Sequence, residues 1–346
     1  TFPKNTWNSS QYWVDLTFTP GTTPTTTTPK PTTTTTTTAT PKPTTTTTST
    51  TTAPTTPTTT ATTTPSGMTN CVTQPSRCGY PDATNTGVPA GTTLRRVPQD
   101  VTSGPGWVWD SRGWLQASSG AVVSDVIVSG TINVGGSNIT VKNSRILVGG
   151  ETWGIGLQHA TNAVISNNEI GILGGSPRLM VGVKDIYGDS TGTQVLRNNV
   201  ANTSTGIQVY EGLIADNYIH DMGYASGDHI NGTTSNGGTK MMTVRHNTVL
   251  NQYSQTDAIS LFQDFGIEAN RLITENLVAG GGYTIYGGDN QRYGKTYNIK
   301  ITNNRFSNVF FANGGSYGPI TAFDPTGTDN AASGNYWDHN LAAVKA

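Results

Sequence analysis

Charge is scarce in this sequence: Asp, Glu, Lys and Arg make up 12% of the 346 residues, and the formal net charge is −1. It has no basic cluster, which argues against nucleic acid or an anionic membrane surface as a partner. No apolar run approaches the ~20 residues needed to span a bilayer, so we expect no membrane insertion. Motifs for nucleotide binding, serine nucleophiles and thiolate zinc sites are also missing.

Cysteine is nearly absent, with only Cys71 and Cys78. Because a linker of the secreted type precedes them, we expect a disulfide between these two cysteines, which stabilises the entrance to the folded domain. Free or metal-binding thiols are the alternative, although no third or fourth ligand lies nearby in the sequence. The chain opens on Thr1 rather than Met, so we expect that the start of the precursor is missing.

Residues 21–66 consist almost wholly of Thr and Pro, with Lys30 and Lys42 as the only charges. Such a segment has no apolar surface to bury, so it is expected to be a disordered, semi-rigid spacer. Dense Thr beside Pro is typical of an O-glycosylated stalk, which favours a secreted or extracellular protein. The alternating aromatic run before it, in residues 1–20, predicts a final β-strand. Trp7 to Asp15 resembles the carboxyl end of a small β-sandwich module appended to secreted carbohydrate-active proteins.

A polar position recurs through the last two hundred residues in the motif V/I-x-x-N-x-apolar. The intervals are 19 to 31 residues, and the repeated positions are Ser144, Asn168, Asn198, Asn217, Asn247, Asn276, Asn304 and Asn335. Around each one, apolar and polar residues alternate as in a strand followed by a turn. A period of this size indicates stacked units. We predict parallel strands ~4.8 Å apart, with the Asn side chains hydrogen-bonded in series along the stack.

This pattern, from Val97 to Trp337, resembles the right-handed parallel β-helix proteins, which include pectate lyases, polygalacturonases and other secreted polysaccharide-degrading enzymes. The resemblance implies an all-β solenoid in residues 67–346, acting as a monomer on a polysaccharide. The segment Gly79 to Gly91 resembles the opening of a group of secreted bacterial β-helix proteins and is expected to precede an amino-terminal cap. Three tryptophans are expected to cover the first coil, or alternatively to stack on sugars: Trp107, Trp109 and Trp114.

The second strand of each coil can be aligned on a central isoleucine, at Ile155, Ile207, Ile230, Ile259, Ile285 and Ile320. If these side chains point inward, the following residues point to solvent. The predicted outer column is Gly156, Gln208, Asn231, Ser260, Tyr286 and Thr321. A row of amides, hydroxyls and a tyrosine is a surface that a sugar chain could follow.

The same alignment places Asp228 and Asp257 at equivalent positions of adjacent coils, with backbones ~4.8 Å apart. Repulsion between two such carboxylates should raise one pKa, so that one group holds a proton near neutrality. Glycoside hydrolysis needs this arrangement of a protonated acid beside an ionised base or nucleophile. The alternative is that both side chains cap the turns that enter the strands. The inverting or retaining outcome stays open.

We therefore predict a glycoside hydrolase with Asp228 and Asp257 as acid and base, tuned by His229 and Asp264. Loops 221–227 and 233–239 are expected to flank the site. The predicted substrate-binding residues are Gln208, Tyr210, Asn231, Tyr286, Asp289 and Arg292.

Two other functions stay open. A polysaccharide lyase would need a base and usually a cation, although the scarcity of Lys and Arg on the outer face argues against a uronate substrate. The candidate bases are Lys184, Tyr210, His229, Tyr286 and Arg292, and the candidate Ca²⁺ ligands are Glu211, Asp228, Asp257 and Asp264. The third possibility is a non-catalytic glycan-binding or adhesive solenoid. No other cofactor is expected.

Overall fold

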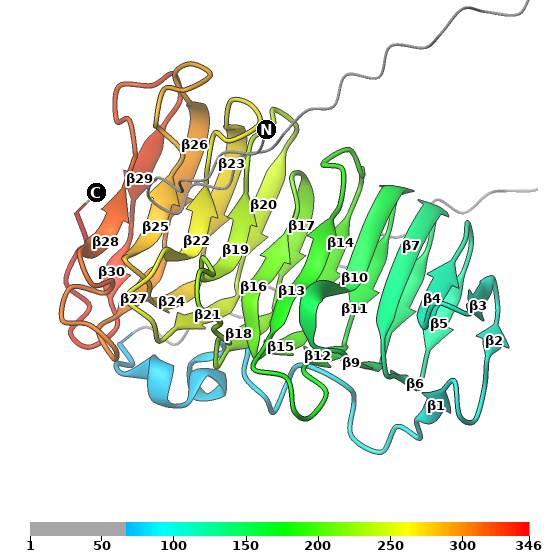
Figure 1. Ribbon diagram of the computed structural model, residues 1–346. Helices are drawn as coiled ribbons and strands as arrows, with labels where there is room; N and C mark the ends of the chain where they lie inside the picture. Colours follow the sequence, from blue (N-terminus) through cyan, green and yellow to red (C-terminus); the bar gives the residue numbers. More distant parts are fainter. Residues whose placement is uncertain (1–66, 346) are drawn as a thin grey trace, which may run out of the picture. The chain divides into compact units, whose positions relative to one another are not determined.

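The computed structural model describes residues 67–345, so the predicted β-sandwich strand in residues 1–20 and the spacer in residues 21–66 lie outside the described part. The described chain winds into a β-solenoid of about nine turns with 47% strand and 3% helix (Figure 1). The predicted all-β solenoid is therefore confirmed. No helix within residues 67–345 is long and apolar enough to cross a membrane.

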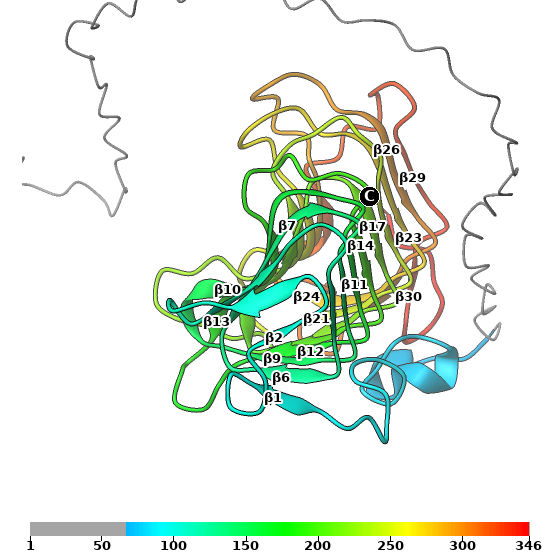
Figure 2. The ribbon, with the colours of Figure 1, turned by 90° about the vertical axis from the view of Figure 1, so that its right-hand side faces the viewer.

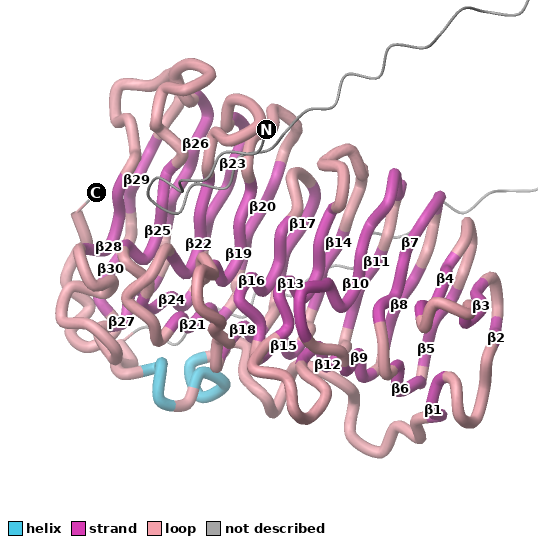
Figure 3. Tube along the Cα trace, in the orientation of Figure 1, coloured by secondary structure: helices cyan, strands magenta, loops and turns pink. Residues whose placement is uncertain are grey.

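Successive coils lay their strands on three long sheets that enclose the core, as the view along the solenoid shows (Figure 2). We name them sheets A, B and C. Strands within each sheet pair in parallel, except for β2–β3 and β3–β4 at the start of sheet B. Figure 3 shows how the strands repeat from coil to coil.

Sheet A has ten strands, namely β1 (Arg95–Val97), β6 (Val126–Val128), β9 (Arg145–Leu147), β12 (Glu169–Gly171), β15 (Asn199–Ala201), β18 (Tyr218–His220), β21 (Thr248–Asn251), β24 (Leu277–Gly280), β27 (Arg305–Ser307) and β30 (Tyr336–Trp337).

Sheet B has eleven strands, namely β2 (Ser103–Gly104), β3 (Trp107–Trp109), β4 (Trp114–Ala117), β7 (Thr131–Ser137), β10 (Gly150–Thr161), β13 (Leu179–Asp185), β16 (Thr203–Gln208), β19 (Asn231–Ser235), β22 (Asp257–Leu261), β25 (Tyr283–Gly287) and β28 (Gly318–Thr321).

Sheet C has nine strands, namely β5 (Val122–Ser124), β8 (Thr140–Lys142), β11 (Val164–Ser166), β14 (Gln194–Leu196), β17 (Gly212–Ala215), β20 (Met242–Arg245), β23 (Ala269–Thr274), β26 (Tyr297–Thr302) and β29 (Ala331–Ser333).

The core consists of apolar columns in which equivalent residues of successive coils lie in register. In sheet C one buried column contains Val141, Ile165, Val195, Ile214, Val244, Ile273 and Ile301. β-Branched side chains suit such a column because they pack closely on a pleated surface. At the first coil, Trp107 and Trp109 pack against the core, as a cap requires. Trp114 instead faces Trp153, with ring centroids 6.2 Å apart.

The predicted Asn ladder is confirmed in the turn between sheets C and A. Asn247 shows the pattern: its Oδ1 accepts hydrogen bonds from the backbone N–H and the Nδ2 of Asn217, both 2.9 Å long. Its Nδ2 donates to the carbonyl of Ile214 and to Oδ1 of Asn276, each at 3.0 Å. Because every ladder Asn is buried, this series of bonds satisfies polar groups that no solvent reaches.

The residue before each ladder position adopts the left-handed conformation, a feature that the repeat motif alone does not reveal. Positive φ angles of 49° to 67° occur at Asn143, Asn167, Arg197, Asp216, His246, Glu275, Asn303 and Gly334. A left-handed residue makes the chain turn sharply, and asparagine tolerates this conformation better than most residues. This explains the Asn-Asn pairs at two of the turns, Asn167-Asn168 and Asn303-Asn304.

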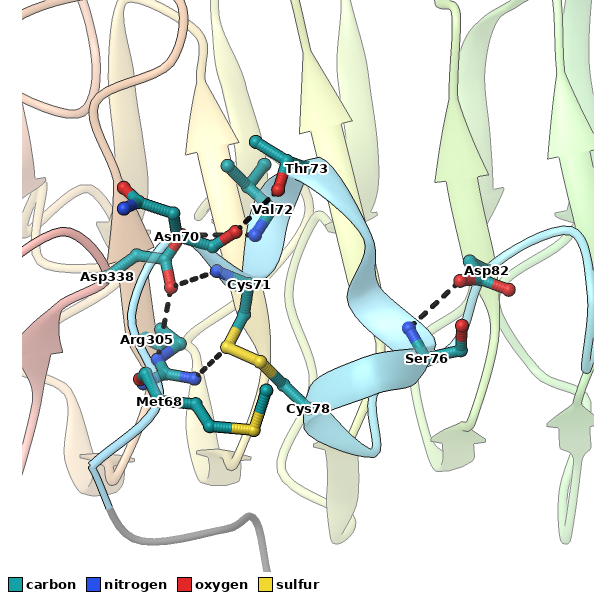
Figure 4. The surroundings of a disulfide bond; sticks show 10 residues. All are labelled: Met68, Asn70, Cys71, Val72, Thr73, Ser76, Cys78, Asp82, Arg305 and Asp338. Carbon is teal, nitrogen blue, oxygen red and sulfur yellow. Dashed lines mark hydrogen bonds and ion pairs between the residues drawn. A yellow bond between two sulfur atoms is a disulfide. The ribbon is translucent and has the colours of Figure 1, made fainter.

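The Cys71–Cys78 disulfide is confirmed, but its predicted position at the entrance of the solenoid is wrong. It lies between two short 3₁₀ helices, η1 (Cys71–Thr73) and η2 (Pro75–Cys78), that pack on the carboxyl-terminal coils (Figure 4). Asp338 accepts the backbone N–H groups of Cys71 and Val72, while Arg305 donates to the carbonyl of Met68.

From there the chain runs back along sheet A to the first coil (Figure 1). The Tyr80 ring stacks on His246 at 5.5 Å, and the Gly87 N–H donates to the carbonyl of Arg197 over 3.0 Å. β1 then pairs with β6. Residues 67–97 therefore tie the last coils to the first. Sequence could not show this, because contacts such as Cys71–Asp338 join residues 267 positions apart.

Candidate functional site

The strands of sheet B set the register of the candidate site, and this register differs from the predicted one at one coil. Ile207 pairs with Thr233, which pairs with Ile259 and then Ile285. The predicted alignment on Ile230 is therefore wrong. Ile230 is buried but precedes the strand, so an inward threonine takes the position that an aliphatic residue was expected to fill.

The outer column changes accordingly. In register after Gly156 come Lys184, Gln208, Thr234, Ser260, Tyr286 and Thr321. Thr234 thus stands where Asn231 was predicted, and the coil of Lys184, which the alignment omitted, belongs to the series. Burial lowers the pKa of Lys184.

Asp228 and Asp257 are not neighbours, which corrects the predicted carboxylate pair. Asp228 lies in the loop before β19. There Nε and Nη2 of Arg178 each donate a hydrogen bond of 2.7 Å to one of its carboxylate oxygens. Ser204 Oγ and the Ala225 N–H also donate to it. Burial alone would raise the pKa of Asp228, but these hydrogen bonds outweigh it and lower the pKa to about 2. Asp228 is therefore an ionised anchor for its loop.

Asp257 opens β22, in register with Asn231 on β19 and, one coil further, Thr205 on β16. Its side chain is fully buried, and neither carboxylate oxygen has a hydrogen-bond partner among residues 67–345. The Ser260 hydroxyl, three residues further along β22, donates to Thr234 Oγ1 over 3.0 Å. Burial raises the pKa of Asp257 well above its usual value. A raised pKa was expected here, but the cause is desolvation rather than a second carboxylate.

Asp257 belongs to a group of buried polar atoms that lack partners. Within the described residues twelve such side-chain atoms occur, and five of them sit on four residues at this place. They are Asn231 Oδ1, Gln255 Oε1, Thr256 Oγ1 and both oxygens of Asp257. Buried polar atoms in folded proteins are nearly always hydrogen-bonded, so this local concentration of unpaired ones is unusual.

A cleft of about 600 Å³ opens on the outer face of sheet B above these residues. Five of the predicted site residues line it: Gln208, His229, Asn231, Asp264 and Tyr286. The alignment missed six others: Thr205, Thr234, Asn236, Gln255, Thr256 and Phe262. The sequence could have indicated them by position. Gln255 and Thr256 directly precede Asp257, and the other four residues lie on or just after β16, β19 and β22. Phe262 and Tyr286 form an aromatic pair, with ring centroids 5.3 Å apart.

Two ion pairs hold the segments that adjoin the cleft lining. The Arg178–Asp228 pair holds the loop that carries His229. In the other pair, Glu268 binds Arg271 at 2.5 Å with both side chains fully buried. Glu268 also accepts the Ser235 hydroxyl and the Gly237 N–H, which flank Asn236. These contacts support the segments that carry His229 and Asn236.

The other predicted binding residues lie outside the cleft lining. Tyr210 accepts a hydrogen bond from Nε2 of Gln208 over 3.3 Å. Arg292 pairs with Asp264 at 3.6 Å. Asp289 follows β25, with one buried carboxylate oxygen that lacks a partner within the described chain.

The four carboxylates considered for Ca²⁺ do not gather at one place. Residues 67–345 contain no group of three or more His, Cys, Asp or Glu side chains that could hold a metal ion. Glu211 accepts the Thr193 N–H, Asp228 binds Arg178, and Asp257 lies in another coil.

No family model and no curated protein sequence matches this chain. The chemistry of the cleft therefore has to be inferred from its own residues.

Proposed function

We propose that the cleft over β16, β19, β22 and β25 binds a polysaccharide chain. The unpaired amide, hydroxyl and carboxyl atoms beneath the cleft support this most strongly. Sugar hydroxyls both donate and accept hydrogen bonds, so they match such a mixed set. The Phe262–Tyr286 pair supplies an apolar surface for the C–H face of a sugar ring. Three interstrand steps of ~4.8 Å make the cleft ~14 Å long, which suits several sugar rings.

Replacing Tyr286 by alanine tests this proposal. We expect wild type to bind at least one member of a panel of soluble polysaccharides in affinity electrophoresis and calorimetry. Tyr286→Ala should weaken that binding by at least about tenfold, since central aromatic residues dominate binding energies. Tyr297→Ala is the matched control, because this partly exposed tyrosine belongs to sheet C. Equal affinity of wild type and Tyr286→Ala, or no binding by wild type, would contradict the proposal.

Glycoside hydrolysis is a second candidate function, and the state of Asp257 favours it. A carboxyl group that stays protonated at neutral pH is what a general acid requires. Asp257 is in register with Asn231, which lines the cleft. Asp264 is too distant to be its partner, since β22 from Asp257 to Leu261 alone spans ~13 Å at ~3.3 Å per residue. Paired catalytic carboxyls lie ~5–9.5 Å apart.

This mechanism requires that a substrate in the cleft reach the buried carboxyl of Asp257. Asp257 then donates its proton to the glycosidic oxygen while the bond from that oxygen to the anomeric carbon breaks. Water adds to the anomeric carbon, and its proton passes to the imidazole of His229. His229 lies two residues before Asn231, which is in register with Asp257. Its exposed side chain lines the cleft. His229 then releases this proton to solvent, and Asp257 takes up a proton from solvent, which restores both groups.

A further inference from the structure

Four aromatic rings form a continuous row that leaves the cleft on its carboxyl-terminal side. Phe262 and Tyr286 belong to the cleft itself. The Tyr283 ring lies 5.8 Å from Tyr286, and the Tyr317 ring lies 5.8 Å from Tyr283. The row thus passes from the end of β22 across β25 to the turn before β28.

Packing in the core does not account for the outer end of this row. Tyr317 is 70% exposed. Its backbone is nevertheless held, because its N–H donates to the carbonyl of Gly282 over 2.7 Å and the neighbouring Ser316 N–H donates to the carbonyl of Gly281 over 2.8 Å. Gly318 allows close approach, since a Cβ there would lie 3.2 Å from the Tyr283 ring. An exposed aromatic side chain held in place beside a cleft marks a binding surface.

The charge of this surface restricts its ligand. The eleven residues that line the cleft include one acidic residue, Asp264, and no Lys or Arg. Arg292 lies 3.6 Å from Asp264 and is thereby paired. A polyanionic chain would meet a carboxylate without a free cation in the lining, whereas an uncharged chain meets no repulsion.

We propose that Tyr283 and Tyr317 form an additional subsite that stacks further rings of an uncharged glycan, whose chain crosses the coils along the solenoid axis. This inference rests on the proposed function of the cleft. The cleft binds the middle of the chain through hydrogen bonds, and the two tyrosines extend the contact through apolar ring faces.

Binding of neutral oligosaccharides of increasing length tests the subsite. The probes are the disaccharide to the octasaccharide of the neutral polysaccharide that wild type binds best. We expect wild-type affinity to rise with length. Tyr317→Ala should weaken binding of the longest oligosaccharides by roughly 3- to 10-fold while leaving the shortest ones unchanged. Tyr317→Phe, which keeps the ring, should bind like wild type, and so should Tyr297→Ala.

Three results would overturn the inference in different ways. If Tyr317→Ala retains the wild-type gain with length, the row is not a subsite, although the cleft still binds glycans. Tighter binding of acidic than of neutral oligosaccharides would reject the uncharged substrate class. If wild type binds no oligosaccharide at all, the proposed function of the cleft fails and the subsite fails with it.

Discussion

Asn247→Leu is expected to lower the free energy of unfolding by about 3 kcal/mol or more. Leucine has a similar volume but can neither accept the two hydrogen bonds from Asn217 nor donate to the carbonyl of Ile214 and to Asn276. Each buried polar group left unpaired costs about 1–3 kcal/mol. Because the ladder lies at the turn between sheets C and A, the loss should affect the coils on both sides.

Urea unfolding followed by far-ultraviolet circular dichroism measures this effect. Asn308→Leu is the matched control, since Asn308 is exposed and makes no side-chain hydrogen bond in the described structure. The control should stay within about 0.5 kcal/mol of wild type. A loss below about 1 kcal/mol in Asn247→Leu would show that the ladder bonds do not stabilise the stack.

Asp257→Asn is expected to reduce polysaccharide turnover by at least about 100-fold, if the cleft hydrolyses its ligand. Asparagine has nearly the same shape as the protonated carboxyl group but has no proton to donate. Release of reducing ends from the polysaccharide that wild type binds is the measurement. Turnover retained in Asp257→Asn would reject the acid role, and absence of wild-type turnover would leave binding alone. An unsaturated product absorbing in the near ultraviolet would indicate a lyase instead.

The same variant should gain stability relative to wild type as the pH rises. The pKa of Asp257 is raised in the folded state, so folded wild type binds more protons than the unfolded chain above about pH 4. Its stability is therefore lost progressively as the pH rises from the unfolded pKa towards the folded one. Asparagine does not titrate, so the unfolding free energy of Asp257→Asn minus that of wild type should increase from pH 4 to pH 8. A constant difference would show that Asp257 ionises freely.

Local repetition made the fold predictable. The spacing of Asn168, Asn198 and their equivalents fixes the coil-to-coil register of the turn, because each amide must meet the next one. The left-handed residue before each of them was not predicted, since side chains as different as Arg197 and Glu275 occupy it. The contacts of Cys71 with the last coils could not be predicted either, because no local pattern specifies them.

The candidate site was predicted only in part, because loops of unequal length separate the ladder from sheet B. Counting from the ladder does not reveal that β19 begins at Asn231, and the apolar Ile230 suggested a false alignment. The alignment error created the pair of Asp228 and Asp257, although it left Gln208, Ser260 and Tyr286 in the correct column. Burial, which raises the pKa of Asp257, depends on packing from several coils and is not visible in sequence.

The most direct test of the glycan-binding cleft is a crystal structure of the protein with the longest neutral oligosaccharide that it binds. We predict sugar density over Phe262 and Tyr286, with hydroxyl groups hydrogen-bonded to the side chains of Asn231 and Gln255, which line the cleft. Density elsewhere on the solenoid, with the cleft occupied only by water, would contradict the account.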